Sequence, residues 1–184
     1  MEPATFGIPE ELREWPLLPS SEIEFKSWGK GIPDGSVESL ERELRFKFPT
    51  EFVEQSSTHN HAMLAGILVY NTPVCKGLTT NQFLGFGYAA PGVPEVFLQD
   101  LVSVVIAADP NFADGPFSSY VPFARVLQSI ATEEEKNPYN TKSYLAFKKT
   151  DGSVHLLSPP AEKTARVADD FASFLKQSAY LAVD

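Results

Sequence analysis

The sequence predicts an α+β fold, in which helices pack against an antiparallel or mixed β-sheet within a single domain over residues 1–184. Helical patterns near both ends enclose a middle that is rich in short apolar and β-branched runs. A length of 184 residues suits one domain of ordinary size. Fifteen prolines predict short elements, because proline ends helices and leaves sheet hydrogen bonds unmade.

Residues 1–27 form a proline-rich N-terminal arm ahead of a core over residues 28–178. Pro9 suits the first turn of a short helix that runs to Trp15. We expect the rest of the arm to be ordered and to run extended over the surface, because a flexible tail seldom carries two tryptophans. Its apolar anchors are expected to be Trp15, Leu17, Leu18, Ile23, Phe25 and Trp28.

Two helices are expected after the arm. The first spans residues 36–47, with Ser36 as its N-cap and an apolar stripe at helical spacing. A second, shorter helix over residues 50–55 buries Phe52, and residues 56–61 follow as a polar loop. The stripe of the first helix consists of Val37, Leu40 and Leu44.

The middle of the chain predicts three strands and one further helix. Residues 62–70 are apolar and β-branched, which is typical of a buried strand, and a second strand is expected around residues 82–86. Residues 95–106 combine helical spacing with β-branched side chains and are interpreted as a helix. Residues 109–118 are expected to form a loop that precedes a strand near residues 123–127.

The clearest local signal is a β-hairpin. Residues 143–149 and 153–157 flank Asp151-Gly152, and both residues of such a two-residue turn readily take a positive φ. A closing helix is expected from about Asp169, which serves as its N-cap. The inward stripe of this helix is expected to be Val167, Phe171, Phe174, Leu175 and Ser178.

The charge balance narrows the classes of partner. The net charge is −9 and the sequence pI is about 4.8, which disfavours nucleic acid and anionic membranes, because both attract clusters of lysine and arginine. Residues 1–55 alone hold 12 acids and 6 bases, a net charge of −6. A basic protein partner is permitted, since opposite charge steers association.

No feature of the sequence predicts secretion or membrane insertion. The N-terminal residues lack the basic and apolar stretches of a signal peptide. The longest apolar run, residues 62–70, is far shorter than the roughly 18 residues of a spanning helix. Cys75 is the single cysteine, so no internal disulfide can form, and a cytoplasmic protein is expected.

The histidines and the cysteine are interpreted as structural residues. His59 and His61 lie near Cys75, but a zinc site needs three or four ligands, and the remaining histidine, His155, lies in the hairpin. A small enzyme that uses Cys75 as nucleophile and one of these histidines as base is the less favoured alternative. We therefore expect no metal, no cofactor and no catalytic residue.

Two further patterns have ordinary explanations. Residues 85–90 (GFGYAA) imitate a dinucleotide-binding fingerprint, but the prolines that follow prevent the helix whose N-terminus would hold a pyrophosphate. A glycine-aromatic strand with a close backbone contact is predicted instead. The acidic run Glu133–Glu135 predicts a solvated loop, because consecutive side chains point in different directions.

Three stretches resemble SMI1/KNR4-like domains of the SUKH superfamily. Residues 37–52 (VESLERELRFKFPTEF) resemble the acidic helix, turn and apolar-proline step that open these domains. Residues 120–125 (YVPFAR) resemble an apolar-Pro-Phe-Ala strand of the family. Residues 169–175 (DDFASFL) resemble the closing helix, with Asp170 where serine is usual. The sequence departs from the family in residues 56–60, which lack the usual Asn-Gly turn.

The resemblance implies an α+β fold with helices on one side of a sheet, and it implies no active site. Bacterial members are often immunity proteins that neutralise a toxin by binding it, and fungal members act as interaction scaffolds. An immunity protein whose partner is a basic toxin domain is therefore the leading expectation, and a scaffold or regulatory module is the alternative. The oligomeric state stays open.

The partner-facing surface is expected on the two N-terminal helices. Their acidic residues come in pairs three positions apart, and such pairs share a helix face. An amphipathic helix also places charges on its solvated side for solubility alone. The residues expected to face a partner are Glu38, Glu41, Glu51 and Glu54.

Overall fold

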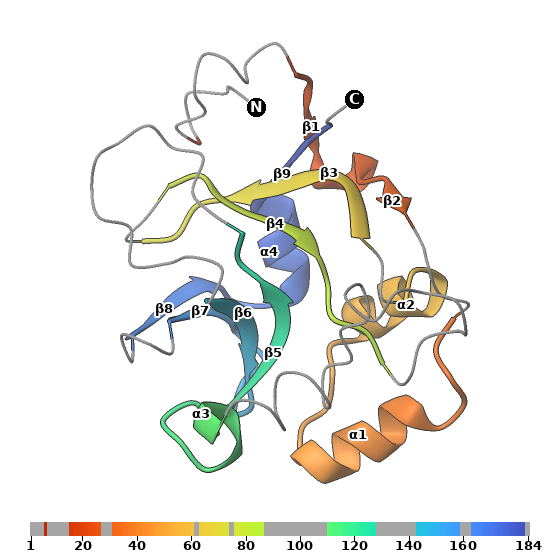
Figure 1. Ribbon diagram of the computed structural model, residues 1–184, viewed down its shortest axis with the longest axis vertical. Helices are drawn as coiled ribbons and strands as arrows, with labels where there is room; N and C mark the ends of the chain where they lie inside the picture. The colour runs from red at the N-terminus through yellow and green to blue at the C-terminus, as the bar shows by residue number, and fades with distance from the viewer. Residues whose placement is uncertain are drawn as a thin grey trace.

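Two antiparallel β-sheets, with helices packed around them, form the α+β fold that the sequence predicts (Figure 1). The computed structural model describes residue 6 and residues 15–26, 31–60, 63–73, 76–86, 110–127, 143–158 and 163–182. Every strand pairing in these ranges is antiparallel. No helix within them has the length and apolar content that crossing a membrane requires.

The first sheet is organised around β3 (Met63–Tyr70), which confirms the strand predicted from its apolar, β-branched residues. β4 (Leu78–Gln82) pairs with one edge of β3, while β9 (Ala179–Leu181) and β2 (Phe25–Lys26) pair with the other. β1 (Leu17–Pro19) pairs with β9. The N-terminal arm and the last strand of the chain therefore lie side by side (Figure 1).

The second sheet is a meander whose strands follow one another in chain order. The chain that follows β4 links the two sheets, because the Leu84 amide donates to the Phe123 carbonyl at 2.7 Å. The two sheets consequently share one hydrophobic core. The strands of the second sheet are β5 (Tyr120–Arg125), β6 (Tyr144–Lys148), β7 (Val154–Ser158) and β8 (Lys163–Ala168).

The described helices are short, as the prolines predict. The apolar stripe of the first helix is confirmed, since Leu40 and Leu44 are buried. Ser36 is not the N-cap, which is a correction: Gly35 holds that position with φ of 74°, and the Ser36 hydroxyl turns back to donate to the Pro33 carbonyl at 2.7 Å. The helices are η3 (Ser20–Glu22, a 3-10 turn), α1 (Ser36–Leu44), α2 (Thr50–Thr58), α3 (Pro110–Ala113) and α4 (Phe171–Gln177).

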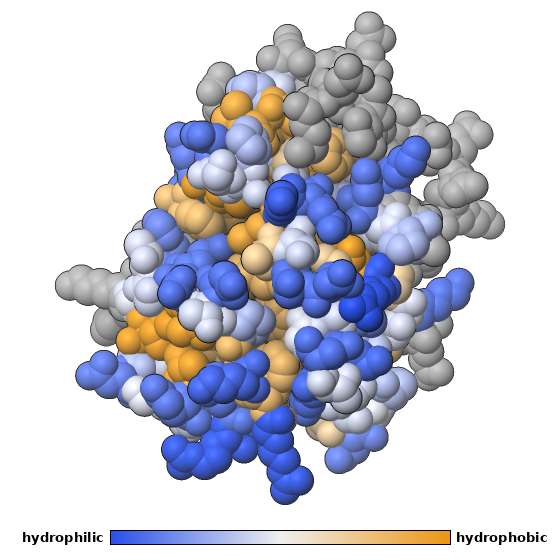
Figure 2. All heavy atoms as spheres, turned by 180° about the vertical axis from the view of Figure 1, so that it is seen from behind, coloured by the Kyte–Doolittle hydropathy of each residue, from blue (hydrophilic) through white to orange (hydrophobic). Residues whose placement is uncertain are grey.

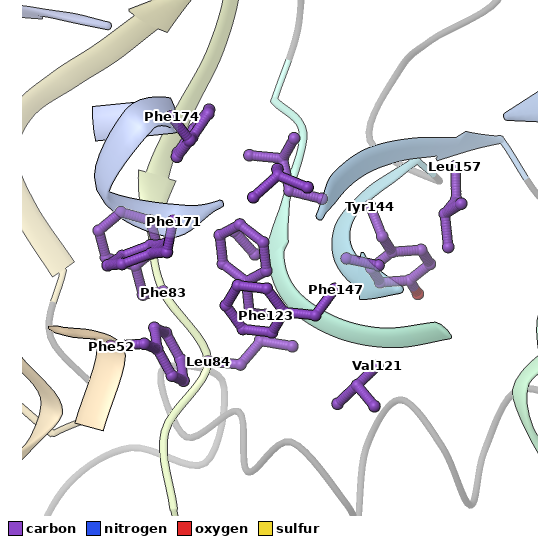
Figure 3. Packing of buried hydrophobic residues seen from close by; sticks show 14 of the residues in the cluster. Phe52, Phe83, Leu84, Val121, Phe123, Tyr144, Phe147, Leu157, Phe171 and Phe174 are labelled. Atoms are coloured by element: carbon purple, nitrogen blue, oxygen red, sulfur yellow. The ribbon is translucent and has the colours of Figure 1, made fainter. Parts of the chain in front are cut away.

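Phenylalanine rings fill the core between the sheets and the helices (Figure 3). Phe123 and Phe147, from neighbouring strands, stack with their centroids 4.3 Å apart. Phe171 of α4 meets Phe123 edge-on at 5.6 Å, and Phe174 meets it at 6.0 Å. Edge-to-face pairs of this kind are favoured by the charge distribution of aromatic rings. The core thus uses the abundant phenylalanine of the sequence.

Four predictions for the chain before β5 are wrong, since α1 also ends at Leu44 rather than at residue 47. α2 continues to Thr58 rather than ending near Gln55, because Ser56 faces the interior and is buried. The second strand lies at residues 78–82 rather than 82–86, because these residues pair with β3, and the buried hydroxyl of Thr80 bonds the Arg125 carbonyl. The predicted loop over residues 109–118 contains the short helix α3.

The β6–β7 hairpin is confirmed, but its turn differs from the prediction. Four residues, 149–152, separate Lys148 from Ser153, whose backbone groups bond at 2.9 Å. Gly152 takes the left-handed conformation with φ of 71°, whereas Asp151 does not. Asp151 instead accepts hydrogen bonds from the amide and hydroxyl of Ser153, at 3.0 and 2.5 Å. The longer turn therefore needs only one left-handed residue.

The C-terminal helix begins one residue later than predicted. Its N-cap is Asp170, whose carboxylate accepts from the Ser173 amide at 2.7 Å. Asp169 is not the cap, because it pairs with Arg166 at 2.8 Å. Phe171 and Phe174 are buried as expected, but Val167 lies in β8 and is not part of the helical stripe. Neither β8 nor β9 is predicted by the sequence.

The N-terminal arm runs extended in β1 and β2, as expected, but the 3-10 turn η3 interrupts its path, which the sequence did not predict. Leu17 and the half-buried Trp15 pack on a small cluster around Phe6, which is 2% exposed. This cluster is separate from the main core and also contains Val69, Ala179 and Leu181. Three predictions concern residues outside the described ranges. They are the helix that starts at Pro9, the anchor Trp28 and the helix over residues 95–106.

Candidate functional site

The predicted partner surface is only partly available to solvent. Glu38, Glu51 and Glu54 are exposed on α1 and α2. Glu41 is different, because its Oε1 accepts from the Phe48 amide at 2.9 Å and its side chain is only 16% exposed. Its Oε2 also lies 3.7 Å from the Lys47 ammonium. Glu41 therefore holds the turn between the two helices. We use the term acidic surface for the three exposed carboxylates that remain, one on α1 and two on α2.

Buried apolar residues on the inward sides of α1 and α2 position the acidic surface. Phe52 on α2 is fully buried and so directs Glu51 and Glu54, which lie three residues apart, toward the outside of the same helix. Leu40 does the same for Glu38 on α1. Figure 2, which views the molecule from behind relative to Figure 1, shows that hydrophilic residues dominate this face, with smaller apolar patches between them. A hydrophilic exterior is thus not confined to the residues of the acidic surface.

Three polar side chains, those of Asp151, Ser153 and His155, interact in a row at the start of β7. The Ser153 hydroxyl donates to Asp151 at 2.5 Å and lies 2.9 Å from Nε2 of His155. Because the hydroxyl proton points to Asp151, Nε2 of His155 is assigned as the protonated nitrogen. Nδ1 of His155 is buried and finds no hydrogen-bond partner among the described residues. The carboxylate thus orients the serine, whereas in a nucleophilic triad it orients the histidine.

Burial is the main reason why the pKa of His155 is held below its usual value. The positive charges of Lys148 and Arg166 lower this pKa further, while Asp151 opposes them. The ring is only 7% exposed and lies edge-on to Tyr120, with centroids 5.3 Å apart. His155 is therefore a neutral, packed residue at pH 7.

We expect the free energy of unfolding to fall as the pH drops below about 6.5, the ordinary histidine value. In the folded state His155 binds its proton at lower pH than in the unfolded state, so acid favours unfolding between the two pKa values. Urea titrations at pH 7.5, 6.5 and 5.5 measure this slope. A His155→Phe variant is expected to lose part of it, and an unchanged slope would contradict the assignment.

The remaining histidines and the cysteine either lie in separate parts of the fold or lie outside the described residues. His59, at the end of α2, stacks on Phe25 with centroids 4.5 Å apart and so helps to hold the arm. His155 lies in the second sheet. His61 and Cys75 lie outside the described residues, as does the run Glu133–Glu135. Within the part of the chain that is described, no three His, Cys, Asp or Glu side chains are grouped as a metal site requires.

Asn60 is a structural residue that the sequence does not reveal. It is 2% exposed, and its Nδ2 donates to the carbonyls of Phe86 and Gly31, at 2.8 and 3.1 Å. Its Oδ1 accepts from the Phe86 amide at 2.8 Å. The glycine-aromatic strand predicted from residue 85 onward is thus held through its backbone at Phe86, while residues 87–90 lie outside the described residues.

Residues 37–52, 120–125 and 169–175 meet at one point of the core. Phe52, from the first stretch, lies 5.7 Å from Phe123 of the second and 5.3 Å from Phe171 of the third. Their rings are labelled together in Figure 3. In comparisons with known proteins, no family model matches the chain, and no curated protein sequence matches it.

Proposed function

We propose that this chain is a non-catalytic protein-binding domain of SMI1/KNR4-like type, which neutralises a bacterial toxin by direct binding in the cytoplasm. The observation that carries the proposal is the meeting of the three resembling stretches at Phe52, Phe123 and Phe171. Residues so far apart in the chain share a cluster only if the whole fold brings them there. This supports a common architecture over a chance likeness of short segments.

The acidic surface is the proposed contact for the toxin. Glu38, Glu51 and Glu54 are exposed, and the chain as a whole carries a net charge of −9. A basic toxin domain would be steered toward this surface, and its association would weaken as salt screens the charges. Glu41 is left out of the contact, because its carboxylate already binds the Phe48 amide.

The test begins with a pull-down of the tagged chain from its native lysate, followed by identification of any stoichiometric partner by mass spectrometry. The double variant Glu51→Lys/Glu54→Lys is then compared with a matched control, Glu22→Lys/Asp114→Lys. Both reverse two exposed carboxylates, and the control residues lie on η3 and beside α3. We expect the first variant to weaken association with the partner about tenfold or more, mainly through the association rate.

The control is expected to bind nearly as tightly as the unaltered chain, and circular dichroism verifies that both variants fold. Equal weakening by both variants would show that total charge, and not the acidic surface, sets the affinity. A set of several signalling proteins in the pull-down, with no toxin among them, would favour the scaffold function instead. Co-expression with the partner then checks neutralisation, because an immunity protein restores growth.

A further inference from the structure

Three Asp-Gly dipeptides occur in the chain, and the fold places them in different surroundings. They are Asp34-Gly35, Asp114-Gly115 and Asp151-Gly152. The first precedes α1, the second follows α3, and the third lies in the turn between β6 and β7. Aspartate before glycine can react with its own backbone, because glycine has no side chain to hinder the approach. Whether it does so in the folded chain depends on what both residues contact.

The reaction needs no partner other than water. The amide nitrogen of the glycine attacks Cγ of the aspartate, and the new N–C bond closes a succinimide ring. The carboxyl OH and the amide hydrogen leave together as water. A water molecule then opens the ring at one of its two carbonyls. Opening at the side-chain carbonyl restores aspartate, whereas opening at the main-chain carbonyl gives isoaspartate, whose backbone is longer by one methylene.

The Asp151 carboxylate is held away from this reaction. It accepts hydrogen bonds from the amide and hydroxyl of Ser153, at 3.0 and 2.5 Å, and lies 3.9 Å from the Arg166 guanidinium. The Gly152 amide, which would have to attack, instead donates to the Lys148 carbonyl at 2.8 Å. The hydrogen bonds from Ser153 also hold the pKa of Asp151 below its usual value, and an ionised carboxylate is a poor electrophile. Both reacting groups are thus already bound.

The Asp114-Gly115 peptide is held by packing. A Cβ atom at Gly115 would lie only 2.6 Å from Cα of Asn111, so the chain folds tightly against α3 here. The Gly115 carbonyl accepts from the Ser118 amide at 3.1 Å, and the Asp114 amide donates to the Pro110 carbonyl at 3.4 Å. The Asp114 side chain is exposed, but its main chain cannot move toward the carboxyl group without breaking these contacts.

Asp34-Gly35 has neither restraint. Asp34 is exposed, and its carboxylate makes no hydrogen bond or ion pair with the residues that the structure describes. The Gly35 amide has no acceptor among them either. Gly35 is exposed, and a Cβ atom there would meet nothing within 4 Å. The turn is closed around the dipeptide by Ser36, whose amide and hydroxyl donate to the Pro33 carbonyl at 3.1 and 2.7 Å.

We propose that Asp34 is a site of spontaneous isomerisation to isoaspartate, and that Ser153 protects Asp151 from the same reaction. The added methylene lies inside the turn that Ser36 closes onto the Pro33 carbonyl. It separates these two groups and so loosens the start of α1, which begins at Ser36. The modification does not depend on what the chain binds.

The test incubates the full chain at pH 7.5 and 37 °C and follows isoaspartate over time by enzymatic methyl labelling and peptide mapping. Cleavage after lysine and arginine places the dipeptides in separate peptides, 31–42, 77–125 and 150–163. We expect isoaspartate in peptide 31–42 to form at least about tenfold faster than in peptide 150–163, because the second site must first open locally. A form of peptide 31–42 that is lighter by one water, the succinimide, is also expected. In guanidinium chloride, where the chain is unfolded, both peptides are expected to react at similar rates.

Two variants test the two parts of the proposal. Ser153→Ala is expected to speed isoaspartate formation in peptide 150–163 by about two- to tenfold, the factor that an ordinary hydrogen bond contributes, and to leave peptide 31–42 unchanged. Asp34→Glu keeps the charge but would need a larger ring, so it is expected to abolish isoaspartate and succinimide in peptide 31–42. Ser119→Ala removes an exposed hydroxyl elsewhere and is the matched control, expected to change neither rate. Circular dichroism verifies that the variants fold.

The rates in the folded chain decide the proposal. Fast formation in peptide 31–42 that is lost in Asp34→Glu, with slow formation in peptide 150–163 that Ser153→Ala speeds up, supports both parts. Equal rates in these two peptides, or faster formation in peptide 77–125 than in peptide 31–42, would overturn the assignment of Asp34. An unchanged rate in Ser153→Ala would overturn the protective role of Ser153.

Discussion

Replacing Phe52 by alanine is expected to lower the free energy of unfolding by about 3–5 kcal/mol, the usual loss for a large aromatic side chain in a core. The ring is 0% exposed and meets five others, with centroid distances between 5.3 and 6.0 Å. It joins α2 to the second sheet and to α4 (Figure 3). These neighbouring rings belong to several different elements, so they cannot all move inward to fill the cavity that the alanine would leave. The five rings are those of Phe48, Phe86, Phe123, Phe147 and Phe171.

Urea denaturation followed by circular dichroism measures this loss. Phe52→Leu is expected to lose less, because it leaves a smaller cavity at the same place. Val53→Ala, on the next and only half-buried residue of α2, is expected to lose about 1 kcal/mol or less. A loss for Phe52→Ala no larger than for Val53→Ala would show that the ring does not hold the core together.

Asn60→Ala is expected to cost about 2–4 kcal/mol, although the residue carries no charge and little apolar surface. The variant leaves the amide and carbonyl of Phe86 without their partner, and Phe86 is 0% exposed. Buried polar groups that lose their hydrogen bonds are costly, because no water replaces the lost partner. The Gly31 carbonyl loses a bond as well. The same urea titration measures the effect.

A second substitution at this position tests the direction of the hydrogen bonds. In Asn60→Asp the carboxylate can still accept from the Phe86 amide, but it cannot donate to the two carbonyls unless it is protonated. Burial would raise its folded-state pKa above the unfolded value of about 3.9. The folded state then binds more protons, so the stability of the variant relative to the original chain should fall as the pH rises through this range.

Ser57→Ala is the matched control for both changes, because Ser57 is exposed and its hydroxyl donates to the Glu54 carbonyl of its own helix, at 2.6 Å. It is expected to change stability by less than about 0.5 kcal/mol. If Asn60→Ala were equally mild, the three hydrogen bonds of Asn60 would not contribute to the fold, and the link from α2 to Phe86 would have to come from packing alone.

The site residues show the limit of local reasoning. Spacing along the sequence identifies the acidic residues of α1 and α2, but it predicts the same partner-facing role for Glu38 and Glu41. The turn after α1 separates them, because it brings the Phe48 amide to the carboxylate of Glu41 and leaves Glu38 in solvent.

By itself, the sequence determined the elements whose signals are local. The stripe of α1, the apolar run of β3, the hairpin of β6 and β7 and the aromatic face of α4 were all predictable, because spacing and turn chemistry act over a few residues. The α+β class follows from their order. The abundance of phenylalanine in the sequence also indicated that the core can draw on aromatic rings.

Only the tertiary structure decided the elements that depend on distant partners. β8 carries exposed Lys163, Thr164 and Arg166 and is a strand because β7 offers it a free edge. The three-residue strands β1 and β9 pair with each other, and β9 also pairs with β3. Strands this short have little local preference, so their stability comes from backbone hydrogen bonds to segments far away in the chain. Such pairings leave no periodic pattern in the sequence.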